Sequence, residues 1–104
     1  MTIEPILSRL RTELQTLYGS RLKGLYMYGS YARGRQDIDS DVDVLIVLDR
    51  VEHYADEIDR TGPLISKQSL GAGVSISRVI VSDAQWNAGD TRFLANVSED
   101  AVPV

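Results

Sequence analysis

The segment that decides the fold reads GSYARGRQDIDSDVD and runs from Gly29 to Asp43. A short apolar run, Leu22 to Tyr28, precedes it, and the run that starts at Asp41 becomes wholly apolar by Leu48. Both runs have the length and composition of β-strands, and a glycine followed by serine is typical of a turn. The segment therefore predicts two strands joined by a polar loop, and the second strand is expected at the centre of a sheet.

Patterns on either side of this segment predict the other elements. Apolar residues at three- and four-residue spacing predict an amphipathic helix from about Pro5 to Tyr18. A second helix is expected over 51–70, in two parts because Gly62-Pro63 should end or kink it. β-branched residues predict a third strand from Val74 to Val81, and Ser82 can cap a short helix after it.

The size and composition indicate one folded domain, residues 1–104, with a motif core at 22–81 and a flexible tail at 97–104. Apolar residues make up 43% of the chain, and its longest apolar run is far shorter than the roughly 20 residues that span a bilayer. The net charge of −4 argues against general nucleic-acid binding. The absence of cysteine excludes disulfides and thiol nucleophiles. We expect a cytoplasmic protein without membrane association.

Asp41 and Asp43 are the candidate metal ligands. Residues two apart in a strand face the same side, with Cα atoms roughly 6.5–7 Å apart, so both carboxylates should project together. Mg²⁺ prefers oxygen ligands and shares its shell among carboxylates, waters and substrate phosphates. Two acids at a solvated strand end are the structural alternative for this pair taken alone.

Gly29 and Ser30 are the candidate phosphate-binding residues. Glycine lets the backbone approach a phosphate closely, and serine adds a hydroxyl. Arg33 and Arg35 could bind triphosphate oxygens, or they could balance the charge of the aspartates that follow. A phosphate site beside a metal site is the arrangement that nucleotidyl transfer needs, so the two halves together predict this reaction, whereas each alone could be an ordinary turn or strand end.

The segment closely resembles the signature of the DNA polymerase β-like nucleotidyltransferase superfamily in three pieces, Gly29-Ser30, Ala32-Arg33-Gly34 and Ser40-Asp41-Val42-Asp43. More narrowly, it resembles the minimal nucleotidyltransferases over residues 22–81. The resemblance implies an α/β, two-layer fold with a small mixed sheet packed with helices. It implies that Gly29 and Ser30 contact ATP or another nucleotide triphosphate, and that Asp41 and Asp43 are catalytic residues that bind Mg²⁺.

The same resemblance implies a biological role. Minimal nucleotidyltransferases are often encoded beside a helical HEPN-type protein as antitoxin and toxin, and they transfer AMP from ATP to that partner. The chain is too short to include the second domain of a small-molecule transferase, such as an aminoglycoside-modifying enzyme. We therefore expect a HEPN-type protein as partner.

One departure from the family pattern concerns a third carboxylate, which active members generally supply from the next strand. No acid occurs between Asp59 and Asp83, so Ser75 or Ser77 takes that place. Serine is a poor metal ligand and no base at neutral pH. Asp83, just past the strand, is the other candidate. The departure favours an alternative function, a weakened relative that binds nucleotide and neutralises its partner by binding.

Aromatic residues lie near the motif and late in the chain. Tyr26, Tyr28 and Tyr31 are expected to pack in the core or at its rim, with stacking on a base as the rival role. Trp86 and Phe93 are either core residues or part of a surface that faces a partner. A domain this small should leave apolar surface uncovered, so we expect a homodimer or a hetero-complex as the working form.

Overall fold

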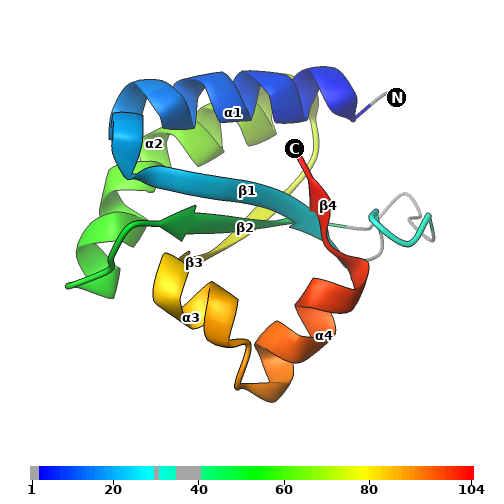
Figure 1. Cartoon of the computed structure of the whole chain (residues 1–104). Coiled ribbons are helices and arrows are strands. Elements are labelled where there is room, and N and C mark those ends of the chain that lie inside the picture. Colours follow the sequence, from blue (N-terminus) through cyan, green and yellow to red (C-terminus); the bar gives the residue numbers. More distant parts are fainter. Residues whose placement is uncertain (1–2, 30, 35–40) are drawn as a thin grey trace.

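The computed structural model describes residues 3–29, 31–34 and 41–104. It shows a mixed four-stranded sheet with α1 and α2 on one face and α3 and α4 on the other (Figure 1). The elements are α1 (Glu4–Tyr18), a 3-10 turn (Gly19–Arg21), β1 (Leu22–Tyr28), β2 (Val42–Leu48), α2 (Tyr54–Ala72), β3 (Ile76–Ser82), α3 (Asp83–Ala88), α4 (Arg92–Asp100) and β4 (Val102–Pro103). The predicted α/β class with a small mixed sheet is confirmed. Within the described ranges, no helix combines the length and apolar character needed to cross a membrane.

The strands lie in the order β3-β2-β1-β4. β1 and β2 are antiparallel, and their register places Tyr28 opposite Asp43. β2 and β3 are parallel, with Asp43 opposite Ser77 and Leu48 opposite Ser82. The end of β1 and the beginnings of β2 and β3 therefore meet at one end of the sheet, which is the end that carries the predicted site.

β2 is the central strand, as predicted, because six of its seven residues are buried and only Asp43 is partly exposed. Alternate residues of the strand serve two different cores. Val44 and Ile46 pack with residues of α1 and α2, whereas Leu45 and Val47 pack with residues of α3 and α4. Burial on both faces explains the continuous apolar run in the sequence.

The predicted break in the second helix is wrong, because α2 is one helix with Pro63 inside it. Pro63 is exposed, so the backbone carbonyl that its missing N–H leaves free can be solvated. Arg78 of β3 also holds this turn to the sheet. Its guanidinium donates hydrogen bonds to Thr61 Oγ1 at 2.8 Å and to the carbonyl of Ile58 at 2.7 Å. Tertiary contacts therefore outweigh the local preference for a break.

The end of the chain is more ordered in secondary structure than we expected. The predicted Ser82 cap is confirmed, since its hydroxyl accepts from the Gln85 N–H and the Gln85 side chain accepts from the Ser82 N–H. Residues 97–104, in the segment predicted to be a flexible tail, complete α4 and add β4 beside β1. The sequence signal is weak because α4 buries only Leu94 and Val97, and β4 has only two residues.

Candidate functional site

The two candidate metal ligands lie where β2 begins. The Asp43 side chain is partly buried on the face covered by α3 and α4, because it alternates with Val42 and Val44, which face α1 and α2. Asp41 immediately precedes the strand and is exposed. The structure thus brings the two carboxylates to the solvated end of the central strand.

The electrostatics of Asp43 suit a cation. Burial raises the pKa of its carboxyl above the ordinary value, the charge of Asp41 raises it further, and the Arg33 guanidinium opposes the shift. The ionised form is therefore costly without a positive charge nearby, and a bound metal ion supplies that charge. Carboxylate oxygens are the ligands that Mg²⁺ prefers. The residues present fit this ion.

Gly29 packs directly against Asp43. Its φ is +78°, which L side chains rarely adopt, and a Cβ at this position would overlap Asp43 Oδ2. The Gly29 carbonyl accepts a hydrogen bond from the Arg33 N–H at 3.1 Å, which closes the turn. The Gly29 backbone is thus in contact with the Asp43 carboxylate. A phosphate bound by this backbone would therefore lie close to a metal ion held by this carboxylate. Ser30, the other candidate phosphate ligand, lies outside the described residues, as do Arg35 and Ser40.

Arg33 has a partner that the sequence did not reveal. Its Nη1 lies 2.9 Å from Asp100 Oδ2, at the end of α4, and both side chains are partly exposed. The pair joins residues 67 positions apart, so no local pattern could have predicted it. Arg33 therefore forms an ion pair with Asp100 on the helix, and its charge also lowers the pKa of Asp43 on the strand.

A hollow of about 210 Å³ adjoins this site between β1 and α4. Its wall includes an edge-to-face pair, Tyr28 and Phe93, with ring centroids 5.9 Å apart. The sequence places Phe93 either in the core or on a surface that faces a partner, and in the structure its side chain is 44% exposed. The hollow also brings in residues that carried no sequence signal. Its lining consists of Tyr28, Gly29, Arg33, Phe93, Asn96, Val97 and Asp100.

The other aromatic residues near the motif serve packing. Tyr26 packs on Trp86 with ring centroids 4.8 Å apart, and both join the core beneath α3 and α4. Tyr31 packs against the core on the opposite face. The expected packing roles of Tyr26, Tyr31 and Trp86 are confirmed.

The third strand supplies serine where the family pattern has an acid. Ser77 lies opposite Asp43 in the parallel register, and the Ser75 carbonyl accepts a hydrogen bond from the Val42 N–H at 2.9 Å. Asp83 lies six residues beyond Ser77, at the other end of β3 and roughly 20 Å away along the strand. Asp83 is therefore not part of the site. In the part of the chain that the structure describes, no three acids or histidines cluster as metal ligands.

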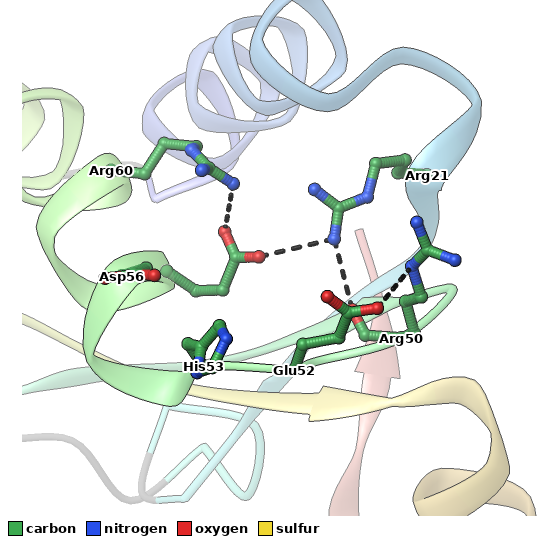
Figure 2. Close-up of a pocket in the computed structure, with 7 residues that line it drawn as sticks. Arg21, Arg50, Glu52, His53, Asp56 and Arg60 are labelled. Carbon is green, nitrogen blue, oxygen red and sulfur yellow. Dashed lines mark hydrogen bonds and ion pairs between the residues drawn. The ribbon is translucent and has the colours of Figure 1, made fainter.

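A second hollow, of about 200 Å³, lies at the opposite end of the sheet (Figure 2). Its main feature is the buried Glu57, which accepts hydrogen bonds from Tyr18 at 2.9 Å, Arg60 at 2.6 Å and Arg21 at 3.3 Å. Among the described residues, no buried side-chain polar atom lacks a partner. These charges satisfy one another, so the cluster holds α1, α2 and the start of β1 together and is not a candidate active site.

Comparison with known proteins agrees with this geometry. The family model for the nucleotidyltransferase domain matches residues 7–98. A candidate protein adenylyltransferase from Methanocaldococcus jannaschii is 32% identical over 101 residues, which are 96% of this chain and 95% of the relative.

Two solved structures share the fold. The structure of a minimal nucleotidyltransferase superposes with a TM-score of 0.65 and 21% identity, over 100% of this chain and 97% of the other. A toxin–antitoxin structure with AMP-PNP gives a TM-score of 0.57 and 17% identity, over 91% of this chain and 69% of the other. The chain belongs to the nucleotidyltransferase domain family, and its fold is that of the minimal nucleotidyltransferases.

Proposed function

We propose that this nucleotidyltransferase transfers AMP from ATP to a protein partner and uses Mg²⁺ held by Asp41 and Asp43. Family membership supports nucleotidyl transfer. The name of the Methanocaldococcus relative, a candidate protein adenylyltransferase, supports a protein as acceptor. The single observation that carries the proposal is the contact between the Gly29 turn and the Asp43 carboxylate. A turn suited to bind a phosphate and a carboxylate suited to bind a metal ion would need this proximity for nucleotidyl transfer.

The residues of the site have separate tasks in this proposal. Asp41 and Asp43 hold the metal, which neutralises charge on the triphosphate when bound. The Gly29 backbone and the Ser30 hydroxyl orient the phosphates. The charge of Arg33 lowers the pKa of Asp43, and its guanidinium is the positive group that we assign to the triphosphate oxygens.

Among the residues that the structure describes, the third strand offers no acid beside Asp43 that could take the acceptor's proton. Ser77, which stands opposite Asp43, cannot act as a base at neutral pH. Either water or a group on the partner must take the proton. We therefore expect the isolated chain to bind nucleotide well and to transfer it slowly.

The partner we propose is a HEPN-type helical protein, with this chain as the antitoxin. The likeness to the fold of a toxin–antitoxin component crystallised with AMP-PNP supports this pairing. The alternative function is neutralisation by binding alone, with nucleotide bound but little transfer. Ser77 in place of the third acid is the observation that favours this alternative.

The test is incubation of the chain with ATP, Mg²⁺ and the neighbouring gene product, followed by mass spectrometry of that product. A mass increase of one AMP supports transfer, and complex formation without modification supports the alternative.

The Asp41→Asn/Asp43→Asn variant should lose Mg·ATP binding in calorimetric titration. Asp59→Asn, at an exposed position on α2, is the matched control. If the double variant binds Mg·ATP as tightly as the unmodified chain, the metal assignment is wrong.

A further inference from the structure

The hollow between β1 and α4 is continuous with the proposed phosphate site. Gly29 and Arg33 line it, and Gly29 also packs against Asp43. Its volume, about 210 Å³, is smaller than the roughly 300–1,000 Å³ of pockets that enclose a whole drug-sized ligand. The hollow can therefore receive one part of a nucleotide while the triphosphate stays at the open end of the strands.

One wall of the hollow is aromatic. Phe93 is 44% exposed, although Leu94 and Val97 of the same helix are buried in the core. Its ring meets Tyr28 edge to face, with an interplanar angle of 87°, so Tyr28 fixes the ring from one side and leaves ring surface exposed. An exposed, positioned aromatic face beside a phosphate site is suited to stacking on a nucleobase.

Another part of the lining is polar. Asn96 stands one helical turn after Phe93 on α4 and is exposed. Its amide has a donor and an acceptor, which together match the N7 acceptor and N6 amino donor of adenine. Guanine offers two acceptors, O6 and N7, at the same edge, so the amide oxygen would have no partner there.

We propose that this hollow holds the base of the bound nucleotide, with Phe93 against the face of the base and Asn96 at its polar edge. The inference rests on the proposed function, because it assumes a triphosphate at Gly29 and Asp43. It adds the place where the adenine of ATP binds and two residues that set the preference for adenine over guanine. Arg33, paired with Asp100 at the rim, lies between the base and the phosphates.

The experiment separates the base from the phosphates. Binding of ATP, GTP and inorganic tripolyphosphate, each with Mg²⁺, is measured by calorimetry for the unmodified chain and for Phe93→Ala, Phe93→Leu and Asn96→Ala. Tyr54→Ala, another exposed aromatic position, is the control. Phe93→Leu keeps an apolar side chain without the aromatic face, and thermal unfolding of each variant verifies that it folds.

Both Phe93 variants should weaken ATP binding, by roughly 5- to 100-fold for Phe93→Ala, the range that loss of base stacking gives. Tripolyphosphate binding should not change in either. Asn96→Ala should reduce the preference for ATP over GTP toward unity. Tyr54→Ala should bind all three ligands as the unmodified chain does.

Several outcomes would overturn the inference. If folded Phe93→Ala binds ATP as tightly as the unmodified chain, the hollow does not hold the base, and loss of partner binding in that variant would assign Phe93 to the partner contact instead. If tripolyphosphate binds the unmodified chain as tightly as ATP, the inference fails while the proposed function stands. If neither ligand binds, both fail.

Discussion

The backbone at Gly29 lies so close to the Asp43 carboxylate that a side chain at position 29 would overlap Oδ2. The turn after β1 and the first acid of β2 are therefore fitted to each other. The antiparallel register explains why, since Tyr28, the residue before the turn, stands directly opposite Asp43. Any change at either residue should affect both the proposed phosphate contact and the proposed metal ligand.

Gly29→Ala should reduce both stability and nucleotide binding. The substitution puts a side chain at φ +78° and into contact with Asp43. Gly34→Ala is the matched control, because its φ is +68° and, apart from its chain neighbours, no atom of the described residues lies within 4 Å of the added Cβ. The backbone strain, about 1–2 kcal/mol, is common to both variants. Urea unfolding and ATP titration should therefore show a larger loss for Gly29→Ala, and equal losses would contradict the contact.

Asp43→Asn should stabilise the metal-free protein at neutral pH. Burial and Asp41 raise the pKa of Asp43 in the folded state, so its stabilising contribution is present at acid pH and is lost as the pH rises and the carboxyl ionises. The amide of the Asp43→Asn variant does not ionise. The stability advantage of this variant over the unmodified chain should therefore disappear below about pH 4. Urea unfolding at both pH values measures this, with Asp59→Asn as the control. An Asp43→Asn protein less stable than the unmodified chain at neutral pH would refute the prediction.

Asp100→Asn should leave stability almost unchanged and alter nucleotide binding through Arg33. The Arg33–Asp100 pair is partly exposed, and such pairs contribute about 0–1 kcal/mol. Without the carboxylate, Arg33 is free to turn toward a phosphate, so Mg·ATP should bind a few-fold more tightly at low salt. The gain in Mg·ATP affinity should vanish when Arg33→Ala is also present. A double-mutant cycle measured by calorimetry detects this loss. A gain that persists without Arg33 would mean that Asp100 acts on the nucleotide directly.

Tyr18 should make the protein sensitive to alkaline pH. Burial, and then its hydrogen bond to Glu57, raise the pKa of Tyr18 to about 12, above the ordinary tyrosine value of about 10. Between these values the unfolded chain has lost the phenol proton and the folded chain retains it, so stability falls as pH rises. The fall is up to about 2–3 kcal/mol. Urea unfolding of Tyr18→Phe should show a smaller loss across this range, and parallel losses would contradict the assignment.

The parts of the fold that rest on local patterns could be predicted from the sequence. The central strand and its two faces follow from the run around Val44, and the capping box at Ser82 follows from the residues next to it. The continuous helix through Pro63 could not be predicted, because Arg78 holds that turn from a strand further along the chain. Short elements such as β4 form only by pairing with β1, so they too have no local signature.

Some residues of the candidate site could likewise be identified from the sequence, and others could not. Asp41 and Asp43 could be identified as a pair because the strand period places them on one face. Asp100 and Phe93 could not be identified from the sequence, because only the tertiary fold brings α4 beside β1. Asp83 was a candidate by nearness in sequence to the third strand, yet β3 carries it to the far end of the sheet.

Ser77→Asp should restore the missing acid. Ser77 stands opposite Asp43 in the parallel register, and side chains of such pairs share a face of the sheet. Ser75 precedes it by two residues and has the same parity, but it lies just outside the strand and next to the exposed Asp41. An aspartate at Ser77 is therefore the better position for a base beside the metal ligands, and Ser75→Asp should help less.

General-base assistance is typically worth about 10²–10⁴ in rate, so Ser77→Asp should raise the rate of AMP transfer at least about tenfold even with imperfect geometry. A third carboxylate beside Asp43 also adds repulsion, so the same variant should be less stable without Mg²⁺ and should gain more stability when the ion is added. Mass spectrometry of the partner over time measures transfer, and thermal unfolding with and without Mg²⁺ measures stability. Ser66→Asp, exposed on α2, is the control for added charge. If the unmodified chain already transfers AMP rapidly and Ser77→Asp does not help, the base comes from the partner and the serine in β3 is no defect.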